Sequence, residues 1–300
     1  METINKSHYQ ILLSNLDTQL KKNKLEIQLL TDIPQFIFRF EVPTVDITGQ
    51  IVSWQNTSSK YFVEEIGDGV TLEMVQIPPG KFTMGSPHGE QGRCNCEEFQ
   101  HEVTVPSFFM GKYQVTQEQY EAVMGYNPSY FSGKKRPVER VSWGDATQFC
   151  NRLSQITGRY FTLPSESQWE YACRAGSTTT FHFGTSLITD LANYNGNYSS
   201  GLAPNGVWRQ ETTEVGNFPP NAYGLYDMHG NVWEWCLDTW HENYFGSPTD
   251  GSAWVDSSTN FRVMRGGCWY WDFSGCRSAS RNYSSGQYNI NGFRVVCLDI

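Results

Sequence analysis

Residues 221–235 read NAYGLYDMHGNVWEW, in which aromatic and aliphatic residues occur in short groups between glycine, asparagine and aspartate. The same texture extends from Thr71 to the end of the chain, where Gly, Pro, Asn and Ser interrupt the apolar runs. Such interruptions are typical of short strands that are connected by long loops. Long ordered loops in a compact domain usually present a functional surface, so we expect the functional residues to lie in them.

Three short helices are predicted within this loop-rich part of the chain. Each begins with a capping box, in which a Ser or Thr is followed three positions later by an acidic residue or Gln, and each residue satisfies a backbone N–H of the other. The three boxes are Thr116 with Gln119, Ser142 with Asp145, and Ser165 with Gln168. No convincing helical period follows Gly176, so we expect strand and loop beyond it.

The N-terminal part of the chain has a different pattern. Residues 8–30 carry leucine and isoleucine at alternating three- and four-residue steps, which predicts one amphipathic helix. Residues 36–54 predict a β-hairpin, because their apolar side chains alternate on either side of a glycine turn. We therefore expect a helix and hairpin module over residues 1–65 and a second domain over residues 66–300. Residues 61–63 leave an alternative open, since they could form a strand that joins the two parts.

The composition excludes several classes of protein. With 22 Lys and Arg against 31 Asp and Glu, the chain has a formal net charge of -9, which argues against a general nucleic-acid partner. No segment approaches the roughly 20 continuous apolar residues that a membrane helix needs, and the first residues lack a secretory pattern. We therefore expect a cytoplasmic protein without membrane insertion, whose 8 cysteines are mostly reduced, buried thiols.

Several motifs from about residue 70 onward resemble those of the formylglycine-generating enzyme (sulfatase-modifying factor) family. Besides the stretch quoted above, they include FTMGS at 82–86, KYQVT at 112–116, LPSE at 163–166, WEYACRAG at 169–176, RGG at 265–267 and GFR at 292–294. The resemblance implies this family's variant of the C-type lectin fold, an α+β domain with little regular structure. The same scaffold carries enzymes and pure binding proteins, so fold alone does not decide the function.

The resemblance also implies a test for enzymatic activity. The enzymes use two cysteines in a C-x4-C spacing, soon after the paired glycines, to bind copper and to oxidise a cysteine of a client sulfatase with oxygen. Soft thiolates are the ligands that hold Cu(I) in this way. Here the first position falls on Trp271, whereas the second could fall on Cys276. Because half of the pair is missing, we expect no copper and no enzymatic activity; a copper-dependent formylglycine-generating oxidase is the alternative.

Residues 268–291, called the variable segment below, resemble more closely the variable proteins of diversity-generating retroelements, several of which use this lectin-type domain. In those systems a template rich in Asn codons is copied with errors at adenines, which yields Tyr, Ser, Asp, Phe, Gly, Ile and similar residues. The expected variable, ligand-binding positions are Tyr270, Trp271, Asp272, Phe273, Ser274, Gly275, Ser280, Tyr283, Ser284, Ser285, Gly286, Tyr288, Asn289, Ile290 and Asn291. Other residues, called frame residues below, are expected to anchor the segment: Trp269, Cys276, Arg277, Ala279, Arg281, Phe293 and Arg294. Of the variable positions, Trp271 is not reachable from an Asn codon by adenine changes.

The composition of the variable segment is also that of a binding surface. Tyr and Trp give large, stiff contact areas with few rotatable bonds, while Ser, Gly and Asn add adaptable hydrogen bonds, as in antibody loops. A broad aromatic surface suits a protein or peptide ligand better than a small molecule. We therefore expect a non-enzymatic ligand-binding display protein. The alternative is that these aromatic residues belong to the core of a tyrosine-rich fold.

One stretch also resembles a calcium loop of the family. In that loop the first and last residues give side-chain oxygens, and two residues between them give backbone carbonyl oxygens. The corresponding residues are Asp227, Gly230, Val232 and Glu234, an all-oxygen set that suits Ca2+. The alternative is a turn that these carboxylates brace without a metal.

Overall fold

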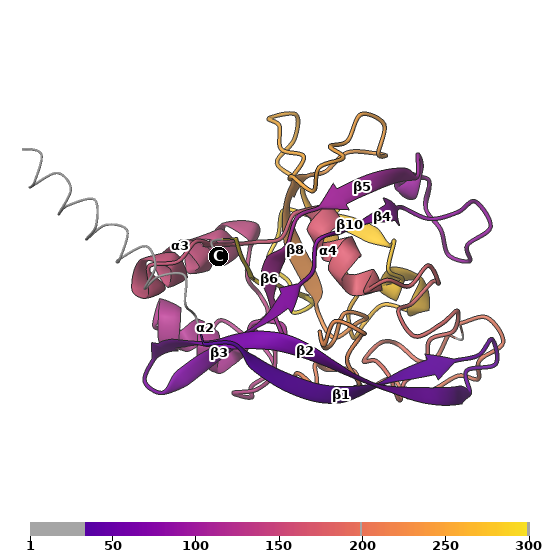
Figure 1. Ribbon diagram of the computed structural model, residues 1–300, viewed down its shortest axis with the longest axis horizontal. Coiled ribbons are helices and arrows are strands. Elements are labelled where there is room, and N and C mark those ends of the chain that lie inside the picture. The colour runs from indigo at the N-terminus through magenta and orange to yellow at the C-terminus, as the bar shows by residue number, and fades with distance from the viewer. Residues whose placement is uncertain (1–33, 199, 299–300) are drawn as a thin grey trace, which may run out of the picture. The chain divides into compact units, whose positions relative to one another are not determined.

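The computed structural model describes residues 34–198 and 200–298, and the expected helix over residues 8–30 lies outside them. A compact unit begins at Phe36 (Figure 1). Its strands are β1 (Phe36–Val45), β2 (Ile51–Gly67), β3 (Val70–Ile77), β4 (Gly80–Met84), β5 (His101–Val105), β6 (Phe108–Gly111), β7 (Phe161–Thr162), β8 (Trp233–Thr239), β9 (Arg262–Arg265), β10 (Arg281–Ser284), β11 (Asn291–Gly292) and β12 (Val296–Cys297). Its helices are α2 (Gln117–Met124), α3 (Trp143–Thr157) and α4 (Glu166–Arg174), with 3-10 turns η1 (Asn95–Glu97) and η2 (Phe273–Cys276).

The three predicted helices are confirmed, and each begins at its capping box. In α2, α3 and α4 the N-cap hydroxyl accepts from the backbone N–H three residues on, and the side chain there accepts from the N-cap N–H. Each helix ends at a residue in the left-handed conformation, which stops further helical hydrogen bonding. After α4 the described residues contain one helical element, the short turn η2.

The predicted hairpin is confirmed, but it is not a separate module. Strand β1 pairs antiparallel with β2, and the second half of β2 pairs antiparallel with β3, so that Tyr61 is matched with Phe36 on one side and Val75 on the other. The hairpin therefore extends the sheet with the order β1-β2-β3-β6-β12-β7. This corrects the boundary expected at residue 65, because residues 61–63 form the joining strand that was the alternative.

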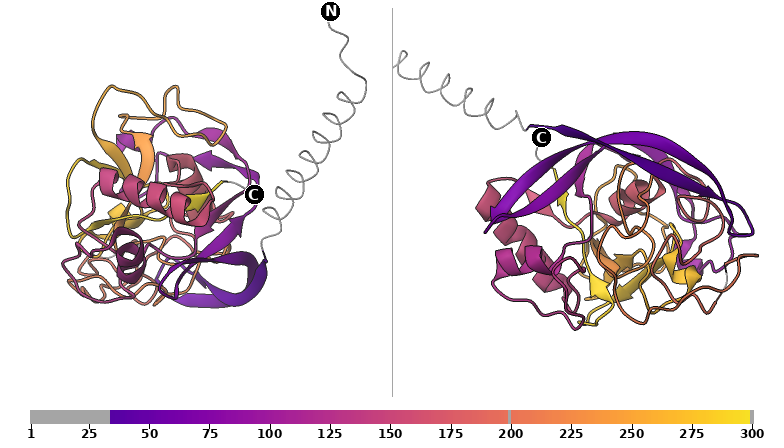
Figure 2. Two further views of the ribbon diagram at one scale, coloured as in Figure 1. Left: turned by 90° about the vertical axis from the view of Figure 1, so that its left-hand side faces the viewer. Right: turned by 90° about the horizontal axis from the view of Figure 1, so that it is seen from below.

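Packing explains why the hairpin belongs to this unit. Phe62 of β2 is fully buried and its ring lies 4.9 Å from that of Phe109 on β6. Phe38 of β1 reaches a distant loop, where a Cβ placed on Gly224 would lie only 2.5 Å from its ring. The Nζ atom of Lys112 lies 4.1 Å above the same ring, which adds a cation–π contact. Figure 2 shows the twisted hairpin running along one side of the domain.

The second sheet positions the C-terminal segment. Its strand order is β10-β9-β8-β11, with β11 parallel to β8 and the other pairs antiparallel. The chain leaves this sheet at the end of β9, passes through η2, and returns to it at β10 and again at β11. Most of the variable segment therefore lies in two connections whose ends are fixed by one sheet.

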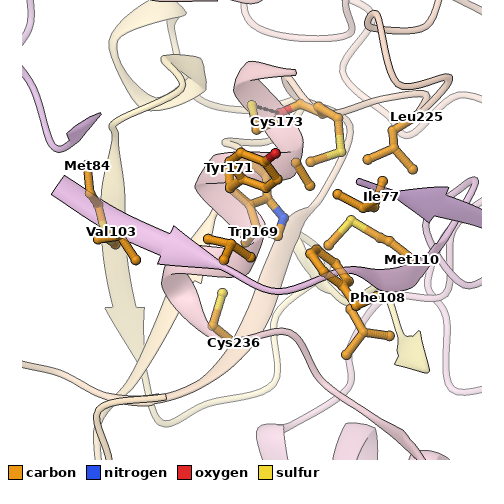
Figure 3. Close-up of a cluster of buried hydrophobic side chains, with 14 of the residues drawn as sticks. Ile77, Met84, Val103, Phe108, Met110, Trp169, Tyr171, Cys173, Leu225 and Cys236 are labelled. Atoms are coloured by element: carbon orange, nitrogen blue, oxygen red, sulfur yellow. Dashed lines mark hydrogen bonds between the residues drawn. The ribbon is translucent and has the colours of Figure 1, made fainter. Parts of the chain in front are cut away.

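The core lies around α4. Trp169 is fully buried among side chains from several strands, which include Ile77, Val103 and Met110, and Cys236 from β8 also belongs to this cluster (Figure 3). Burial of an aromatic side chain of this size is among the largest single contributions to stability. No helix in the described part of the chain has the length and apolar character to span a bilayer.

Candidate functional site: an exposed aromatic surface on a buried frame

The frame residues fix the variable segment to the domain. All of them are buried, and the largest exposed fraction among them is 7%, at Trp269. Arg277 donates to the carboxylate of Glu97, and Arg281 makes a two-bond pair with Glu166 at 2.8 and 2.7 Å. Charge-assisted pairs with this geometry are the strong class of hydrogen bond. The segment is therefore held at its centre and at the start of β10.

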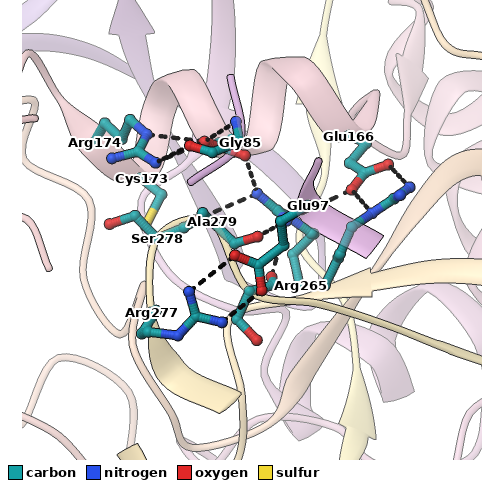
Figure 4. A network of polar contacts seen from close by, with 12 residues as sticks. Gly85, Glu97, Glu166, Cys173, Arg174, Arg265, Arg277, Ser278 and Ala279 are labelled. Carbon is teal, nitrogen blue, oxygen red and sulfur yellow. Dashed lines mark hydrogen bonds and ion pairs between the residues drawn. The ribbon is translucent and has the colours of Figure 1, made fainter. Parts of the chain in front are cut away.

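Arg265, at the end of β9, binds the main chain of the segment (Figure 4). Its Nη1 donates to the carbonyl oxygens of Ala279 and Ser280, both at 2.8 Å, and its Nη2 donates to that of Ser278 at 2.9 Å. The carboxylate of Glu170 accepts a further bond from Nη2 and balances the charge. Arg265 and Glu170 are fully buried, so this network is shielded from water.

Most variable positions lie at the surface between the frame residues. Tyr270, Trp271, Tyr283 and Tyr288 are exposed by 55%, 42%, 44% and 58%, so they do not belong to the core. Ser285 is also exposed, and the partly exposed positions are Asp272, Phe273, Ser274, Ser284, Gly286, Asn289 and Ile290. Phe273 packs in part against a buried apolar cluster. The segment thus offers rings, hydroxyls and amides to the outside.

Three of the expected variable positions are buried. Gly275 and Ser280 still line a surface depression. Asn291 is fully buried in β11, and its Nδ2 donates to the carbonyl of Gly286 at 3.2 Å. The expectation that Asn291 contacts a ligand is corrected, because the pairing of β11 with β8 places this residue inside the domain.

Two neighbouring depressions lie on this surface, and the side chain of Trp271 lines both. The first has a volume of about 260 Å³, and its lining includes Trp240, Trp271, Ser274, Ser280, Asn282 and Tyr283. The second has a volume of about 400 Å³ and is lined by Asn195, Asn197, Tyr198, Trp208, Tyr270, Trp271 and Asp272. Each depression therefore combines positions of the variable segment with residues from elsewhere in the chain.

Sequence reasoning missed the aromatic residues that other loops contribute. Trp208 makes an edge contact with Tyr270, with the ring centres 6.2 Å apart. On the other side, Trp240 and Phe261 flank Tyr283 at 4.6 and 4.9 Å. Trp208 and Trp240 are 60 and 28 residues before the variable segment, whereas Phe261 directly precedes β9; only their aromatic character could have suggested a role.

The residues present do not fit the copper pair of the enzymes. Trp271 occupies the first position, and Cys276 is fully buried. Burial raises the pKa of the Cys268 thiol to about 12 and raises that of Cys276 well above its ordinary value. Across residues 34–198 and 200–298, no group of three or more His, Cys, Asp or Glu side chains could hold a metal ion.

The expected calcium loop brings most of its oxygens together around an atom of this chain. The Nε2 atom of Gln114 lies 3.3 Å from the carbonyl oxygen of Gly230, 3.1 Å from that of Val232 and 3.0 Å from Oε1 of Glu234. It also lies 3.3 Å from the carbonyl oxygen of Asp227. Oxygens of Gly230, Val232 and Glu234 thus converge on this nitrogen, and Asp227 contributes its backbone carbonyl instead of its carboxylate.

Two stacked histidines beside the variable segment predict acid sensitivity. The rings of His182 and His229 are 4.9 Å apart, and Nδ1 of His229 lies 2.7 Å from the carbonyl oxygen of Cys276. Burial, and then the neighbouring His229, lower the pKa of His182 well below its ordinary value; burial lowers the pKa of His229 to about 4. At these two histidines the unfolded chain therefore binds more protons between about pH 6.5 and 4, so their contribution to stability falls as the pH falls through that range.

The variant His182→Phe tests this prediction. A phenyl ring keeps the stack but cannot be protonated, so we expect the wild type to lose about 1–2 kcal/mol more of its unfolding free energy than the variant between pH 7 and 5. Urea unfolding at each pH measures the difference. Burial raises the pKa of Asp227 and Asp238 to about 6 and about 7, but these carboxyls are common to both proteins and cancel. Equal pH slopes for the two proteins would contradict the assignment.

The architecture described above defines a class: a C-type lectin-like α+β domain of the kind seen in formylglycine-generating enzymes. Residues 64–298 match the family model described as the sulfatase-modifying factor enzyme 1-like domain. The chain belongs to this family. Because the match begins at residue 64, β1 and most of β2 precede the part that defines the family.

Individual relatives differ in what their names imply. The formylglycine-generating enzyme of Mus musculus is 26% identical over 287 residues, which cover 75% of this chain and 74% of the mouse protein. The structure of PvdO from Pseudomonas aeruginosa matches with a TM-score of 0.70 and 34% identity, over 79% of this chain and 97% of PvdO. Treponema denticola variable protein 1 matches with a TM-score of 0.69 and 26% identity, over 79% and 98% of the two chains. Family membership thus leaves open whether this chain is an enzyme.

Proposed function

We propose that this chain is a non-enzymatic ligand-binding protein whose variable segment is diversified by a retroelement. One observation supports this proposal most strongly: the variable segment contains buried frame residues and, between them, exposed aromatic residues. A segment built in this way can change its surface while its backbone path is kept. The likeness to Treponema denticola variable protein 1 supports the same function. Seven of the cysteines are free thiols: Cys94, Cys96, Cys150, Cys173, Cys236, Cys268 and Cys276. Free thiols favour a reducing compartment, so we propose that the protein is cytoplasmic.

The chemistry of the two depressions indicates a protein or peptide ligand. The second depression is lined by three aromatic residues, Trp208, Tyr270 and Trp271, and by Asp272. Aromatic faces and a carboxylate together attract a cationic side chain, and the net charge of -9 adds long-range attraction for a basic partner. We therefore expect the ligand to place a Lys or Arg side chain in this depression and an apolar or polar residue in the first.

The oxidase alternative has less support. It needs two thiolates at a surface that a substrate cysteine can reach, whereas Trp271 replaces one thiol and Cys276 is fully buried. The alternative predicts stoichiometric Cu(I) binding, and our proposal predicts none. Titration of the purified protein with Cu(I) decides between them, with Cys276→Ser as the control, because copper held at this position would be lost in that variant.

The DNA beside the coding region tests the diversification directly. We expect a reverse transcriptase gene and a near-copy of the codons for residues 268–291 that differs from them only at adenines in the template. Differences spread evenly over all four bases, or the lack of any repeat, would contradict the retroelement. A ligand-binding role without diversification would then be the surviving part of the proposal.

A further inference from the structure

In the loop of residues 227–234, the side-chain amide of Gln114 lies where the resemblance to the family implies a calcium ion. The Nε2 atom of Gln114 has two hydrogens and four oxygen neighbours at 3.0–3.3 Å. Three of these neighbours are backbone carbonyl oxygens and one is a carboxylate oxygen, which is the mixture that Ca2+ prefers. However, Ca2+ binds oxygens at about 2.3–2.6 Å, and the centre of this cage is occupied by nitrogen.

The orientation of the Gln114 amide is fixed by its neighbours. The backbone N–H of Thr213 can only donate, and it donates to Oδ1 of Asn231 at 2.9 Å. Nδ2 of Asn231 therefore faces Gln114, and it donates to Oε1 of Gln114 at 3.1 Å. Nε2 of Gln114 must then point at the oxygens. Rotating this amide to offer an oxygen to a metal would place two donors against each other at Asn231.

The charges around the cage are already balanced. Glu234 is the one carboxylate that contacts Nε2, and Arg294 pairs with both of its oxygens at 3.0 Å. Trp169 also donates to this carboxylate at 2.7 Å. The carboxylate of Asp227 does not contact Nε2: its Oδ2 accepts from the backbone N–H of Gly216 at 2.7 Å, and its Oδ1 is buried without a hydrogen-bond partner among the described residues. A divalent cation here would lie beside a buried guanidinium with too little negative charge to compensate it.

We propose that the Gln114 amide takes the place of a calcium ion in this loop, so that the chain folds without a metal and the loop is closed by hydrogen bonds. The residues present thus do not fit Ca2+, in contrast to the expectation from the family resemblance. The same geometry predicts that one substitution restores a need for the ion. In Gln114→Glu, two carboxylates and three carbonyl oxygens face one another without a donor between them.

Thermal unfolding of the full chain in excess Ca2+ and in EGTA tests the proposal. We expect the Tm of the wild type to be the same in both within about 1 °C, and its metal content after purification to be far below one calcium per chain. We expect Gln114→Glu to have a lowered Tm in EGTA, and calcium at about a hundredfold above its Kd to raise that Tm by roughly 5–10 °C. Tb3+ luminescence excited through tryptophan, with Trp169 next to the cage, reports binding independently of stability.

A matched control separates this effect from the cost of burying any new carboxylate. The Nε2 atom of Gln117 donates to the carbonyl oxygens of Phe131 and Pro137, and no carboxylate lies among its partners. We expect Gln117→Glu to lower the Tm equally in Ca2+ and in EGTA. Stabilisation of the wild type by Ca2+, or stoichiometric calcium in it, would overturn the proposal, as would a folded Gln114→Glu whose Tm is the same in Ca2+ and in EGTA. If Gln114→Glu does not fold even in Ca2+, the wild-type measurements decide alone.

Discussion

Replacing Arg265 with leucine is expected to lower the free energy of unfolding by about 3–5 kcal/mol. The substitution leaves the buried carboxylate of Glu170 with Arg174 and the backbone N–H of Gly85 as its remaining partners. It also leaves three carbonyl oxygens, from residues 278–280, without their guanidinium donor. A buried charge that loses its partner costs far more than an exposed pair, because water cannot replace the lost bonds. Equilibrium unfolding in urea, followed by tryptophan fluorescence, measures the loss.

Arg262, three residues earlier on β9, provides the matched control. Its guanidinium is half-buried, donates to the carbonyl oxygen of Leu237 and to Thr239, and lies over the ring of Trp143. Arg262→Leu therefore makes the same substitution at a more solvent-exposed site, where we expect the free energy of unfolding to fall by about 1 kcal/mol. If the two variants lose the same amount, then Arg265 does not anchor the variable segment.

The double variant Tyr270→Ser and Trp271→Ser is expected to weaken ligand binding at least about 100-fold, because truncating two aromatic residues at the centre of an interface removes its main contacts. Trp271 is decisive, since it lines both depressions. A peptide selected on the wild type from a displayed random library serves as the probe. Binding is measured by calorimetry or surface plasmon resonance, and the Tm of each protein is measured beside it.

Two exposed residues outside both depressions give the control for this experiment. Ile156, in the last turn of α3, and Tyr160 have exposed fractions of 52% and 53%, similar to those of Tyr270 and Trp271. The variant Ile156→Ser and Tyr160→Ser should bind the selected peptide as the wild type does. Equal binding by both double variants would contradict the placement of the binding surface. Peptides that lack Lys and Arg throughout the selected pool would contradict the basic side chain proposed for the second depression.

Local patterns in the sequence were sufficient to predict the helices and the hairpin. Capping boxes depend on residues three positions apart, and a hairpin depends on adjacent strands, so both can be recognised within a short window. Strands β2 and β3 form a second hairpin, which turns at Asp68 and Gly69 and pairs Tyr61 with Val75. The boundary at residue 65 was misplaced because the polar residues 55–60 continue β2 instead of ending it.

The candidate site was predicted in part. The residues that were predicted lie close together in the sequence, and most of those that were missed lie far from them. The variable segment lies in one stretch, so its ring-rich composition and its frame residues could be recognised together. Trp208 and Trp240 join it through folding alone. Asn291 has the same residue type as a template position, but strand pairing buries it. Gln114 belongs to a separate motif, and its contact with a loop more than a hundred residues away has no local signal.

The clasp between Arg265 and the variable segment recognises polypeptide, not side chains. Every amino acid carries a carbonyl oxygen, so any codon at positions 278–280 keeps the acceptors that the guanidinium uses. Side chains can therefore change at these positions while the bonds from Arg265 to the main chain are kept. The proposed diversification of the variable segment would therefore leave this part of its main-chain path unchanged.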